Sequence, residues 1–262
     1  MSGEKVVILC GGLGTRLREE TEFKPKPMIE VGEKPILWHI MNIYSSFGFN
    51  DFVLCLGYKS EVIRNYFLNY YNFNSDLSIS LGQNTVRVCP YSNDKVDWNV
   101  ILSDTGKSTL KGARIKKIEK FITGDTFMLT YGDGVANIDI NNLLRFHKEQ
   151  GCIGTVTGVS PPSRFGEMII RDKRVASFTE KPQSTGGLIN GGFFVFNRKI
   201  FDVLTLDENC DFEVGALEQL TSIGELAVYP LNKEWACMDT VRDVEYLNRL
   251  WNNGNAFWRR KS

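Results

Sequence analysis

A glycine-rich segment near the N-terminus is the part of the sequence whose residue types point most directly to chemistry. It is the run Gly11-Gly12-Leu13-Gly14-Thr15-Arg16-Leu17, and it follows the apolar residues 6–10 without a gap. Glycine N–H groups can approach phosphate oxygens closely, and such loops bind ligands at the carboxyl edge of a parallel sheet. A dinucleotide-binding fingerprint would need glycine in place of Leu17, and a Walker loop would need Gly-Lys-Ser/Thr. The segment therefore predicts another kind of phosphate-binding turn, with a plain glycine-rich turn as the alternative.

Cations and prolines follow this loop in Lys24-Pro25-Lys26-Pro27-Met28. Proline fixes φ and keeps the preceding residue extended, so we expect both lysines on a stiff loop that faces the glycines. With Arg16 they would place three cations beside a phosphate cradle. Phosphoryl transfer needs such a set, because the charge on the polyphosphate and on the leaving group must be neutralised. The alternative is a solvated surface loop with incidental lysines.

Two aspartates in strand-end positions are candidate metal ligands. Asp133 stands between two glycines directly after the apolar run 127–131, and Asp239 follows a second apolar stretch and precedes the last helical segment. Mg²⁺ takes few protein carboxylates and completes its octahedron with water and phosphate, which suits it to carboxylates beside a phosphate site. A simple turn is the alternative for Asp133, and a helix N-cap is the alternative for Asp239.

A later group of polar residues could bind a second substrate. Glu180 and Lys181 end the strand-like run Phe178-Thr179-Glu180-Lys181-Pro182, and Asn190 opens the run Ile189-Asn190-Gly191-Gly192-Phe193. Lys181 would suit an anionic group, whereas Glu180 and Asn190 could form hydrogen bonds with hydroxyls. A surface ion pair and a strand-opening turn are the alternatives.

The composition limits which kinds of protein can carry these groups. The chain has 262 residues, 42% of them hydrophobic, and its 31 Lys+Arg balance 31 Asp+Glu. No apolar run approaches the ~20 residues of a membrane span, and there is no global basic field for a nucleic-acid backbone. We therefore expect neither a membrane nor a nucleic acid as a partner. Six cysteines without a CxxC pair, and residues 1–5 without the apolar core of a signal peptide, favour a reduced, cytoplasmic protein.

The elements that must position these groups are short apolar strands alternating with amphipathic helices. Strands are expected at 6–10, 51–56, 126–131 and 155–159, and helices at 36–47, 60–70, 112–121 and 140–150, the last with Asn141 near its cap. Residues 77–103 predict short β pieces, and β pairs dominate beyond residue 160, before a final helix over 241–251.

This alternation predicts an α/β fold in which a mixed, mostly parallel sheet is covered by helices and followed by a β-rich C-terminal lobe. No linker rich in proline or glycine divides the chain. We therefore expect one domain over residues 1–262, in which the pattern changes at about residue 160.

These segments, in this order, resemble the sugar-1-phosphate nucleotidylyltransferases, whose pattern is a GGxGTRL loop, a KP-rich segment, a strand-end Asp, an EKP segment and a late Asp. The similarity runs through essentially the whole chain. Further runs that carry it are KPILWHIM at 34–41, WNV and DTG within 98–106, TYGDGVA at 130–136, RFG at 164–166, INGGFFV at 189–195 and MDT at 238–240. The resemblance implies a Rossmann-like nucleotide-diphospho-sugar transferase fold and an enzyme that joins an NTP to a sugar 1-phosphate, releasing pyrophosphate. It also implies that the nucleotide-binding part lies at about 1–160 and a sugar-binding C-terminal lobe at about 161–262.

The resemblance also implies roles for single residues. Arg16 and Lys26 match the catalytic cations, and Lys26 is preferred to Lys24 because it stands eight residues before the Lys34-Pro35 pair. Asp133 and Asp239 match the two carboxylates that hold Mg²⁺. The residues implied in nucleotide binding are Leu9, Gly11, Gly12, Gly14, Thr15, Arg16, Lys26, Asp104, Thr105 and Gly106, and those implied in sugar-phosphate binding are Glu180, Lys181 and Asn190.

Within the family the chain is most similar to the cytidylyl branch, which implies CTP and glucose 1-phosphate as substrates, a homo-oligomer, and a supply of CDP-sugar for surface-polysaccharide synthesis. No general base is required, because a sugar phosphate is already ionised at neutral pH. Two alternatives stay open. One is the same chemistry with UTP, dTTP or another sugar 1-phosphate, and the other is a regulator that binds a nucleotide-sugar without turnover.

Overall fold

The computed structural model describes residues 3–90, 96–160, 167–171, 174–179 and 187–259. A seven-stranded sheet forms its centre, with the strands in the order β14 (Leu226–Leu231), β10 (Gly154–Val159), β13 (Ile189–Asn197), β8 (Thr126–Tyr131), β1 (Val6–Leu9), β4 (Asp51–Leu56) and β7 (Asn99–Asp104). Strand β13 runs antiparallel to its neighbours β8 and β10, whereas the other neighbouring pairs are parallel. The predicted mixed, mostly parallel sheet is confirmed.

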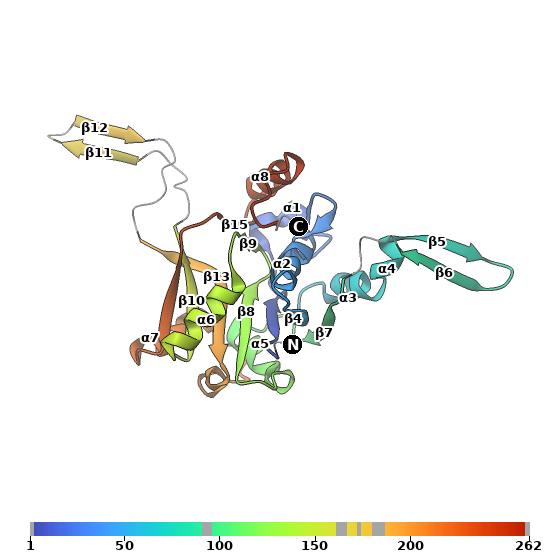
Figure 1. The fold of residues 1–262 in the computed structure, drawn as a ribbon, viewed down its shortest axis with the longest axis horizontal. Coiled ribbons are helices and arrows are strands. Elements are labelled where there is room, and N and C mark those ends of the chain that lie inside the picture. The colour runs from blue at the N-terminus through green and yellow to red at the C-terminus, as the bar shows by residue number, and fades with distance from the viewer. Residues whose placement is uncertain (1–2, 91–95, 161–166, 172–173, 180–186, 260–262) are drawn as a thin grey trace.

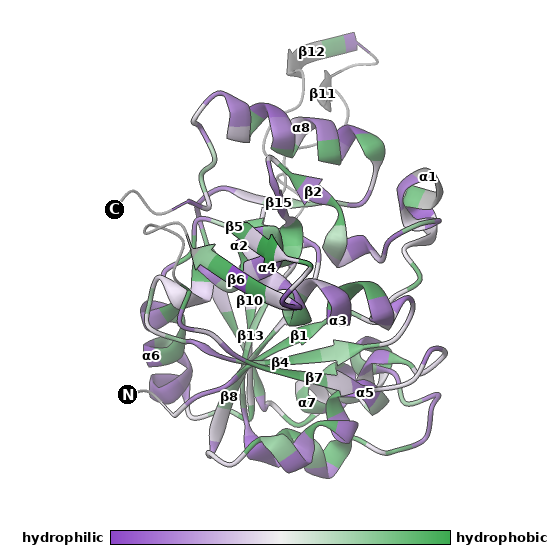
Figure 2. Cartoon of the chain, turned by 90° about the vertical axis from the view of Figure 1, so that its right-hand side faces the viewer, coloured by the Kyte–Doolittle hydropathy of each residue, from purple (hydrophilic) through white to green (hydrophobic). Residues whose placement is uncertain are grey.

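Helices cover both faces of this sheet (Figure 1). One face carries α2 (Ile36–Ser45), α3 (Ser60–Leu68) and α6 (Ile140–Gln150), and the other carries α5 (Lys111–Lys117), η4 (Arg198–Val203), η5 (Phe212–Leu217) and α7 (Glu218–Ser222). Helix α8 (Val241–Asn252) lies beyond the carboxyl edge of the sheet (Figure 1). Strand β1 shows why two cores form: Val6 and Ile8 pack in one apolar cluster, and Val7 and Leu9 pack in the other. Figure 2 shows the apolar strands enclosed by helices whose outer faces are polar.

The strands beyond residue 160 divide among several partners. Strands β13 and β14 complete the central sheet, and β15 (Trp235–Cys237) pairs with β9 (Gly134–Ala136). The pair β11 (Glu167–Arg171) and β12 (Arg174–Thr179) forms a separate hairpin. The predicted β-rich character of this region is therefore confirmed, and two of its strands belong to the same sheet as the N-terminal half.

A second hairpin, β5 (Ser75–Ser80) with β6 (Thr85–Pro90), extends away from the body of the molecule (Figure 1). Near the N-terminus, β2 (Glu30–Val31) and β3 (Lys34–Pro35) form a short antiparallel pair. A lipid bilayer could not be crossed by any helix in the described part of the chain, since none combines the required length with the required apolar character.

Two of the predicted helices divide in the structure, α2 ends two residues earlier than expected, and α6 has the expected bounds but a different cap. The helix expected over 60–70 divides into α3 and α4 (Tyr70–Phe73), because Asn69 leaves helical geometry at φ −110° and ψ 19°. The helix expected over 112–121 likewise divides into α5 and η3 (Glu119–Phe121). The N-cap of α6 is Asp139, whose side chain accepts a hydrogen bond from the Asn142 N–H at 2.9 Å, so Asn141 lies inside the first turn.

Both histidines are buried in structural positions. His39 is 2% exposed, its Nε2 lies 2.8 Å from the Val31 carbonyl oxygen, and its Nδ1 accepts from the Trp258 indole N–H at 3.3 Å. His147 is 4% exposed, and its Nδ1 lies 2.9 Å from the Thr155 hydroxyl. Burial lowers the pKa of each imidazole to about 4. Both rings are therefore neutral in the folded protein at neutral pH.

We expect these two histidines to make the fold sensitive to mild acid. The unfolded state protonates them near the ordinary pKa of ~6.5, so stability is lost as the pH falls from about 6.5 towards 4, by roughly 1–2 kcal/mol per histidine at pH 5. Urea unfolding at pH 7 and pH 5 measures this loss. His147→Gln should reduce the difference between the two pH values, and an unchanged difference would contradict the assignment.

Candidate active site

The glycine-rich loop leaves β1 at the carboxyl edge of the parallel strands β4, β1 and β8. Gly14 has a φ of +64°, which favours glycine, and a Cβ there would lie 2.6 Å from Thr21 Cγ2. The Thr21 hydroxyl lies 3.1 Å from the carbonyl oxygen of Gly14 and 2.9 Å from that of Leu17. These contacts join the loop to the two short helical turns that follow it, η1 (Thr15–Leu17) and α1 (Arg18–Thr21). Arg16 lies in the first of these turns.

The proline-rich segment packs against the end of β8. Pro25 is extended, at φ −69° and ψ 150°, and starts the short turn η2 (Lys26–Met28). A Cβ on Gly132 would lie 2.8 Å from Pro27 Cγ and 2.9 Å from the Leu9 carbonyl oxygen. The glycine after β8 therefore permits Pro27 to approach the sheet edge, which places the neighbouring Lys26 over it.

A short antiparallel ladder brings the two aspartates together. Cys237 of β15 pairs with Gly134 of β9, and the Met238 N–H donates to the Asp133 carbonyl oxygen at 2.9 Å. Asp239 is not the N-cap of α8: Thr240 is, in a capping box with Asp243. The alternative function of Asp239 as a cap is therefore wrong, and its carboxylate is directed to the site.

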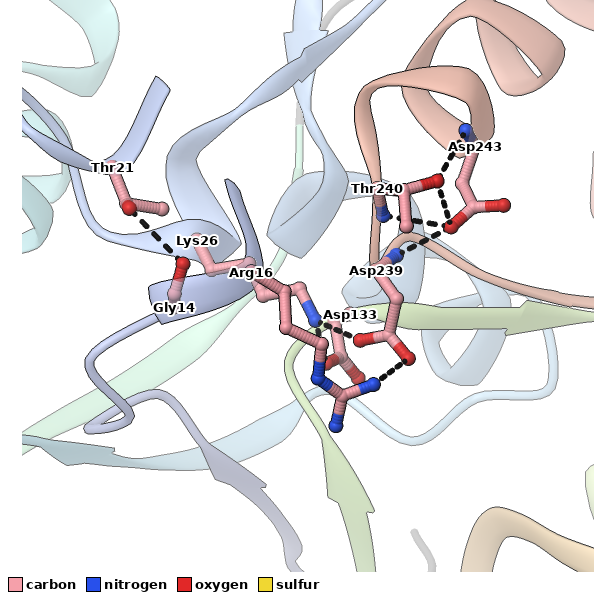
Figure 3. Close-up of polar contacts among 8 residues, drawn as sticks. All are labelled: Gly14, Arg16, Thr21, Lys26, Asp133, Asp239, Thr240 and Asp243. Atoms are coloured by element: carbon pink, nitrogen blue, oxygen red, sulfur yellow. Dashed lines mark hydrogen bonds and ion pairs between the residues drawn. The ribbon is translucent and has the colours of Figure 1, made fainter. Parts of the chain in front are cut away.

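Two carboxylates and two cations meet at this point (Figure 3). Lys26 Nζ lies 2.6 Å from Asp133 Oδ2 and 2.6 Å from Asp239 Oδ1, while Arg16 Nη1 lies 2.8 Å from Asp239 Oδ2. Burial by itself would lower the pKa of the Lys26 ammonium, but the charge of Asp133 and the hydrogen bonds of both carboxylates outweigh it and raise that pKa above its ordinary value. Lys26 is therefore a permanent cation between the two acids.

The same carboxylates meet the requirements of a small hard cation. Asp133 and Asp239 each offer a carboxylate oxygen, and these oxygens lie within 4.8 Å of one another. The two carboxylates are only partly buried, with side chains 25% and 21% exposed, so water and phosphate oxygens can complete a coordination shell. The Lys26 ammonium already lies between the carboxylate oxygens of Asp133 and Asp239, so these two side chains can hold a cation between them.

These groups line one end of a cavity of about 410 Å³, within the ~300–1,000 Å³ typical of small-molecule sites. Besides the glycine-rich loop, its wall contains the segment 107–111, Arg114 and Tyr131. Five cations line it together with the two aspartates, namely Arg16, Lys26, Lys107, Lys111 and Arg114. The excess of positive charge suits a ligand that carries several negative charges.

Most of the residues predicted from the sequence for nucleotide binding and metal binding line this cavity: Leu9, Gly11, Gly12, Gly14, Thr15, Arg16, Lys26, Asp133 and Asp239. Asp104, Thr105 and Gly106 are not among its lining residues. Thr105 is fully buried and its hydroxyl donates to the Leu56 carbonyl oxygen at 2.6 Å, while the Asp104 side chain accepts from the Gly106 N–H at 3.0 Å. Glu180 and Lys181 lie outside the described residues.

Asn190 lies at the start of β13, and its Nδ2 donates to the hydroxyl of Tyr131 at 3.1 Å. It therefore reaches the cavity wall from the C-terminal part of the chain. Lys24, by contrast, lies 3.6 Å from Glu30 and is not part of the cavity lining.

Arg114 is a site residue that the sequence analysis missed. Its side chain is 4% exposed, and its guanidinium donates to the carbonyl oxygens of Leu56 at 3.1 Å, Gly106 at 2.7 Å and Gly11 at 3.1 Å. A Cβ on Gly11 would lie 2.2 Å from Arg114 Nη1. Arg114 thus joins the glycine-rich loop to the opposite wall. In the sequence it is one of four basic residues within 111–117, which does not indicate so many partners.

The fold and this cavity place the chain in a known class. The nucleotidyl transferase family model matches residues 5–253, and the chain belongs to that family. Glucose-1-phosphate cytidylyltransferase of Salmonella typhimurium is 47% identical over 257 residues, covering 97% of this chain and 98% of the relative. The UTP–glucose-1-phosphate uridylyltransferase of Synechocystis is 26% identical over 252 residues, covering 92% of this chain and 61% of the relative. The chain is therefore a nucleotidyltransferase, closer to the cytidylyltransferase than to the uridylyltransferase.

Solved structures support the fold. The structure of HddC from Yersinia pseudotuberculosis has a TM-score of 0.68 at 22% identity and covers 95% of this chain and 99% of its own. A UDP-glucose pyrophosphorylase complexed with UDP-glucose has a TM-score of 0.66 at 15% identity and covers 96% of this chain and 99% of its own.

We expect Arg114→Lys to destabilise the protein by about 2–4 kcal/mol, because an ammonium cannot reproduce the fork of the guanidinium and leaves buried carbonyl oxygens without donors. Urea unfolding measures the loss. Arg145→Lys on α6 is the matched control, since that side chain is 68% exposed and should tolerate the change. Equal stability of the two variants would contradict the bridging role of Arg114.

Proposed function

We propose that this protein transfers CMP from CTP to α-D-glucose 1-phosphate, giving CDP-glucose and pyrophosphate. The observation that carries the proposal is the meeting of Lys26, Asp133 and Asp239 at one end of a cationic cavity whose other wall is the glycine-rich loop. The name of the Salmonella typhimurium relative, at 47% identity over nearly the full chain, supports this pair of substrates.

The reaction needs positioning and charge neutralisation more than proton transfer. The N–H groups of residues 11–14 and the side chains of Thr15 and Arg16 bind the triphosphate, and Lys26 holds the α-phosphate. An oxygen of the sugar phosphate attacks the α-phosphorus in line, the bond to the β-phosphate breaks, and pyrophosphate leaves. Lys26 stabilises the charge that redistributes around the α-phosphate, and Arg16 neutralises the leaving group.

Asp133 and Asp239 would hold Mg²⁺, since their oxygens already share one cation and stand beside the phosphate site. The ion supplies charge neutralisation for the polyphosphate when bound. On the acceptor side, Lys181 would bind the sugar phosphate, with Glu180 and Asn190 on the sugar hydroxyls.

For the base, Leu9 and Gly11 lie on the cavity wall and would contact the nucleoside. Asp104, Thr105 and Gly106 would act through the segment 107–111 and through Arg114, which donates to the Thr105 hydroxyl and to the Gly106 carbonyl oxygen. UTP, dTTP and other sugar 1-phosphates stay alternatives. A regulator without turnover is disfavoured, since Arg16, Lys26, Asp133 and Asp239 are all present and meet.

We further propose that residues 1–262 form a single domain, which the shared seven-stranded sheet supports. A cytoplasmic homo-oligomer that supplies CDP-glucose to surface-polysaccharide synthesis completes the proposal.

Pyrophosphate release over a grid of CTP, UTP, dTTP, ATP and GTP against several sugar 1-phosphates tests this function. We expect CTP with glucose 1-phosphate to be the fastest pair, and a chelator to stop the reaction until Mg²⁺ is restored. A different fastest pair would reassign the substrates, and no release with any pair would favour the regulator.

Lys26→Ala should lower kcat by on the order of a hundredfold or more, with a smaller change in KM for CTP, because its main partner is charge that rearranges at the α-phosphate. Lys24→Ala is the matched control on the same loop and should be mild, since Lys24 contacts Glu30 instead. Initial rates at saturating substrate compare the two variants. Reversed losses would mean that Lys24 is the catalytic lysine.

A further inference from the structure

A chain of hydrogen bonds runs from the helices of one face to Asn190 on the acceptor side of the cavity, through residues to which the proposed mechanism gives no role. Tyr131, the last residue of β8, is its centre. The Tyr131 hydroxyl donates to Glu213 Oε1 at 2.7 Å and accepts from Asn190 Nδ2 at 3.1 Å. Glu213 in turn is paired with Lys111. Four side chains from separate segments are thereby joined through one phenol.

Backbone packing explains how Glu213 reaches this position. A Cβ on Gly112 would lie 2.7 Å from the Cys210 carbonyl oxygen and 2.8 Å from that of Asp211, so the glycine lets α5 contact the segment before η5. The Ala113 N–H donates to the Cys210 carbonyl oxygen at 3.2 Å. The segment η5 is a π-helical turn, a rare conformation that often marks functional sites. It places Glu213 beside Lys111.

The Tyr131 ring is held on its other sides as well. Lys111 Nζ lies 5.3 Å from the ring centroid, and Phe194 packs against the ring edge-to-face at 5.6 Å. Gly192 has a φ of +86°, and a Cβ there would lie 2.8 Å from Tyr131 Cδ2. The ring therefore lies directly against the backbone that follows Asn190, and its hydroxyl has one orientation.

Both polar atoms of the Asn190 side-chain amide, Oδ1 and Nδ2, form hydrogen bonds in this arrangement. Its Oδ1 accepts from the Gly192 N–H at 2.9 Å, and one of its two N–H groups goes to Tyr131. Because Glu213 accepts the Tyr131 proton, the hydroxyl oxygen must offer its lone pair to Asn190. The second N–H of Asn190 is then presented in a defined direction.

We propose that Glu213 is a positioning residue for the sugar side of the site: its carboxylate, held by Lys111, orients the Tyr131 hydroxyl, which orients the Asn190 amide towards the acceptor. This inference rests on the proposed function, in which Asn190 contacts the sugar. It predicts that Glu213 affects acceptor binding without touching the acceptor.

Separate saturation curves for glucose 1-phosphate and for CTP test the proposal. We expect Tyr131→Phe and Glu213→Ala to raise the KM for glucose 1-phosphate roughly five- to tenfold and to leave the KM for CTP within about twofold. Glu213→Gln should restore much of the loss, since its amide oxygen still accepts from Tyr131. Glu218→Ala, an exposed change on the adjoining helix, is the control and should resemble the unsubstituted enzyme.

A double-mutant cycle isolates the coupling. Tyr131→Phe combined with Asn190→Ala should cost no more than Asn190→Ala alone, because the hydroxyl acts through that amide. Additive losses, a parallel rise in both KM values, or an unchanged KM for glucose 1-phosphate in Tyr131→Phe would overturn the proposal. Failure of the proposed function is a separate result, because it appears as absent turnover in the unsubstituted enzyme.

Discussion

Two carboxylates facing each other across a few ångströms need a cation between them, and this requirement organises the site. Asp133 and Asp239 would repel each other strongly in a partly buried position, where charges interact more than they do in bulk water. The Lys26 ammonium removes that repulsion with a contact of 2.6 Å to each acid. The aspartates stand more than a hundred positions apart in the sequence, so the cluster also fastens β8 and its loop to the segment before α8.

The main chain supports this cluster mainly through close approaches that a side chain would prevent. Because Gly132 has no Cβ, Pro27, the neighbour of Lys26, can pack against it. Because Gly11 has no Cβ, the guanidinium of Arg114 can lie against the glycine-rich loop. Each contact lies at the carboxyl end of a parallel strand, where open α/β sheets bind ligands. The glycines therefore do more than expose N–H groups to phosphate. They also let Arg114 and the segment that carries Lys26 pack closely against the ends of the strands, which stabilises the loop.

The sequence predicted the parts of the site that depend on local spacing. Strand β8 and helix α6 have the expected bounds, and the glycine-rich loop, Lys26, Asp133 and Asp239 all line the cavity. It did not predict Arg114 or Glu213, because their importance comes from partners distant in the sequence and from backbone carbonyls that have no signature in residue type. The role predicted for residues 104–106 in nucleotide binding stays a prediction: Thr105 is fully buried, and the cavity is lined by the following residues, from Lys107 onward.

The ion cluster sets a condition on how substrates enter. Lys26 cannot leave Asp133 and Asp239 for an uncharged environment, since two carboxylates would then lose their shared partner at a cost far above that of an exposed ion pair. Lys26 can move away from the two aspartates only if an anionic phosphate binds its ammonium and another cation binds the two carboxylates. The cavity meets the first half of this condition with Lys107, Lys111 and Arg114, whose positive charge in the same cavity attracts a polyphosphate. In the proposed function, Lys26 would therefore reach the α-phosphate only together with a cation that takes its place between Asp133 and Asp239.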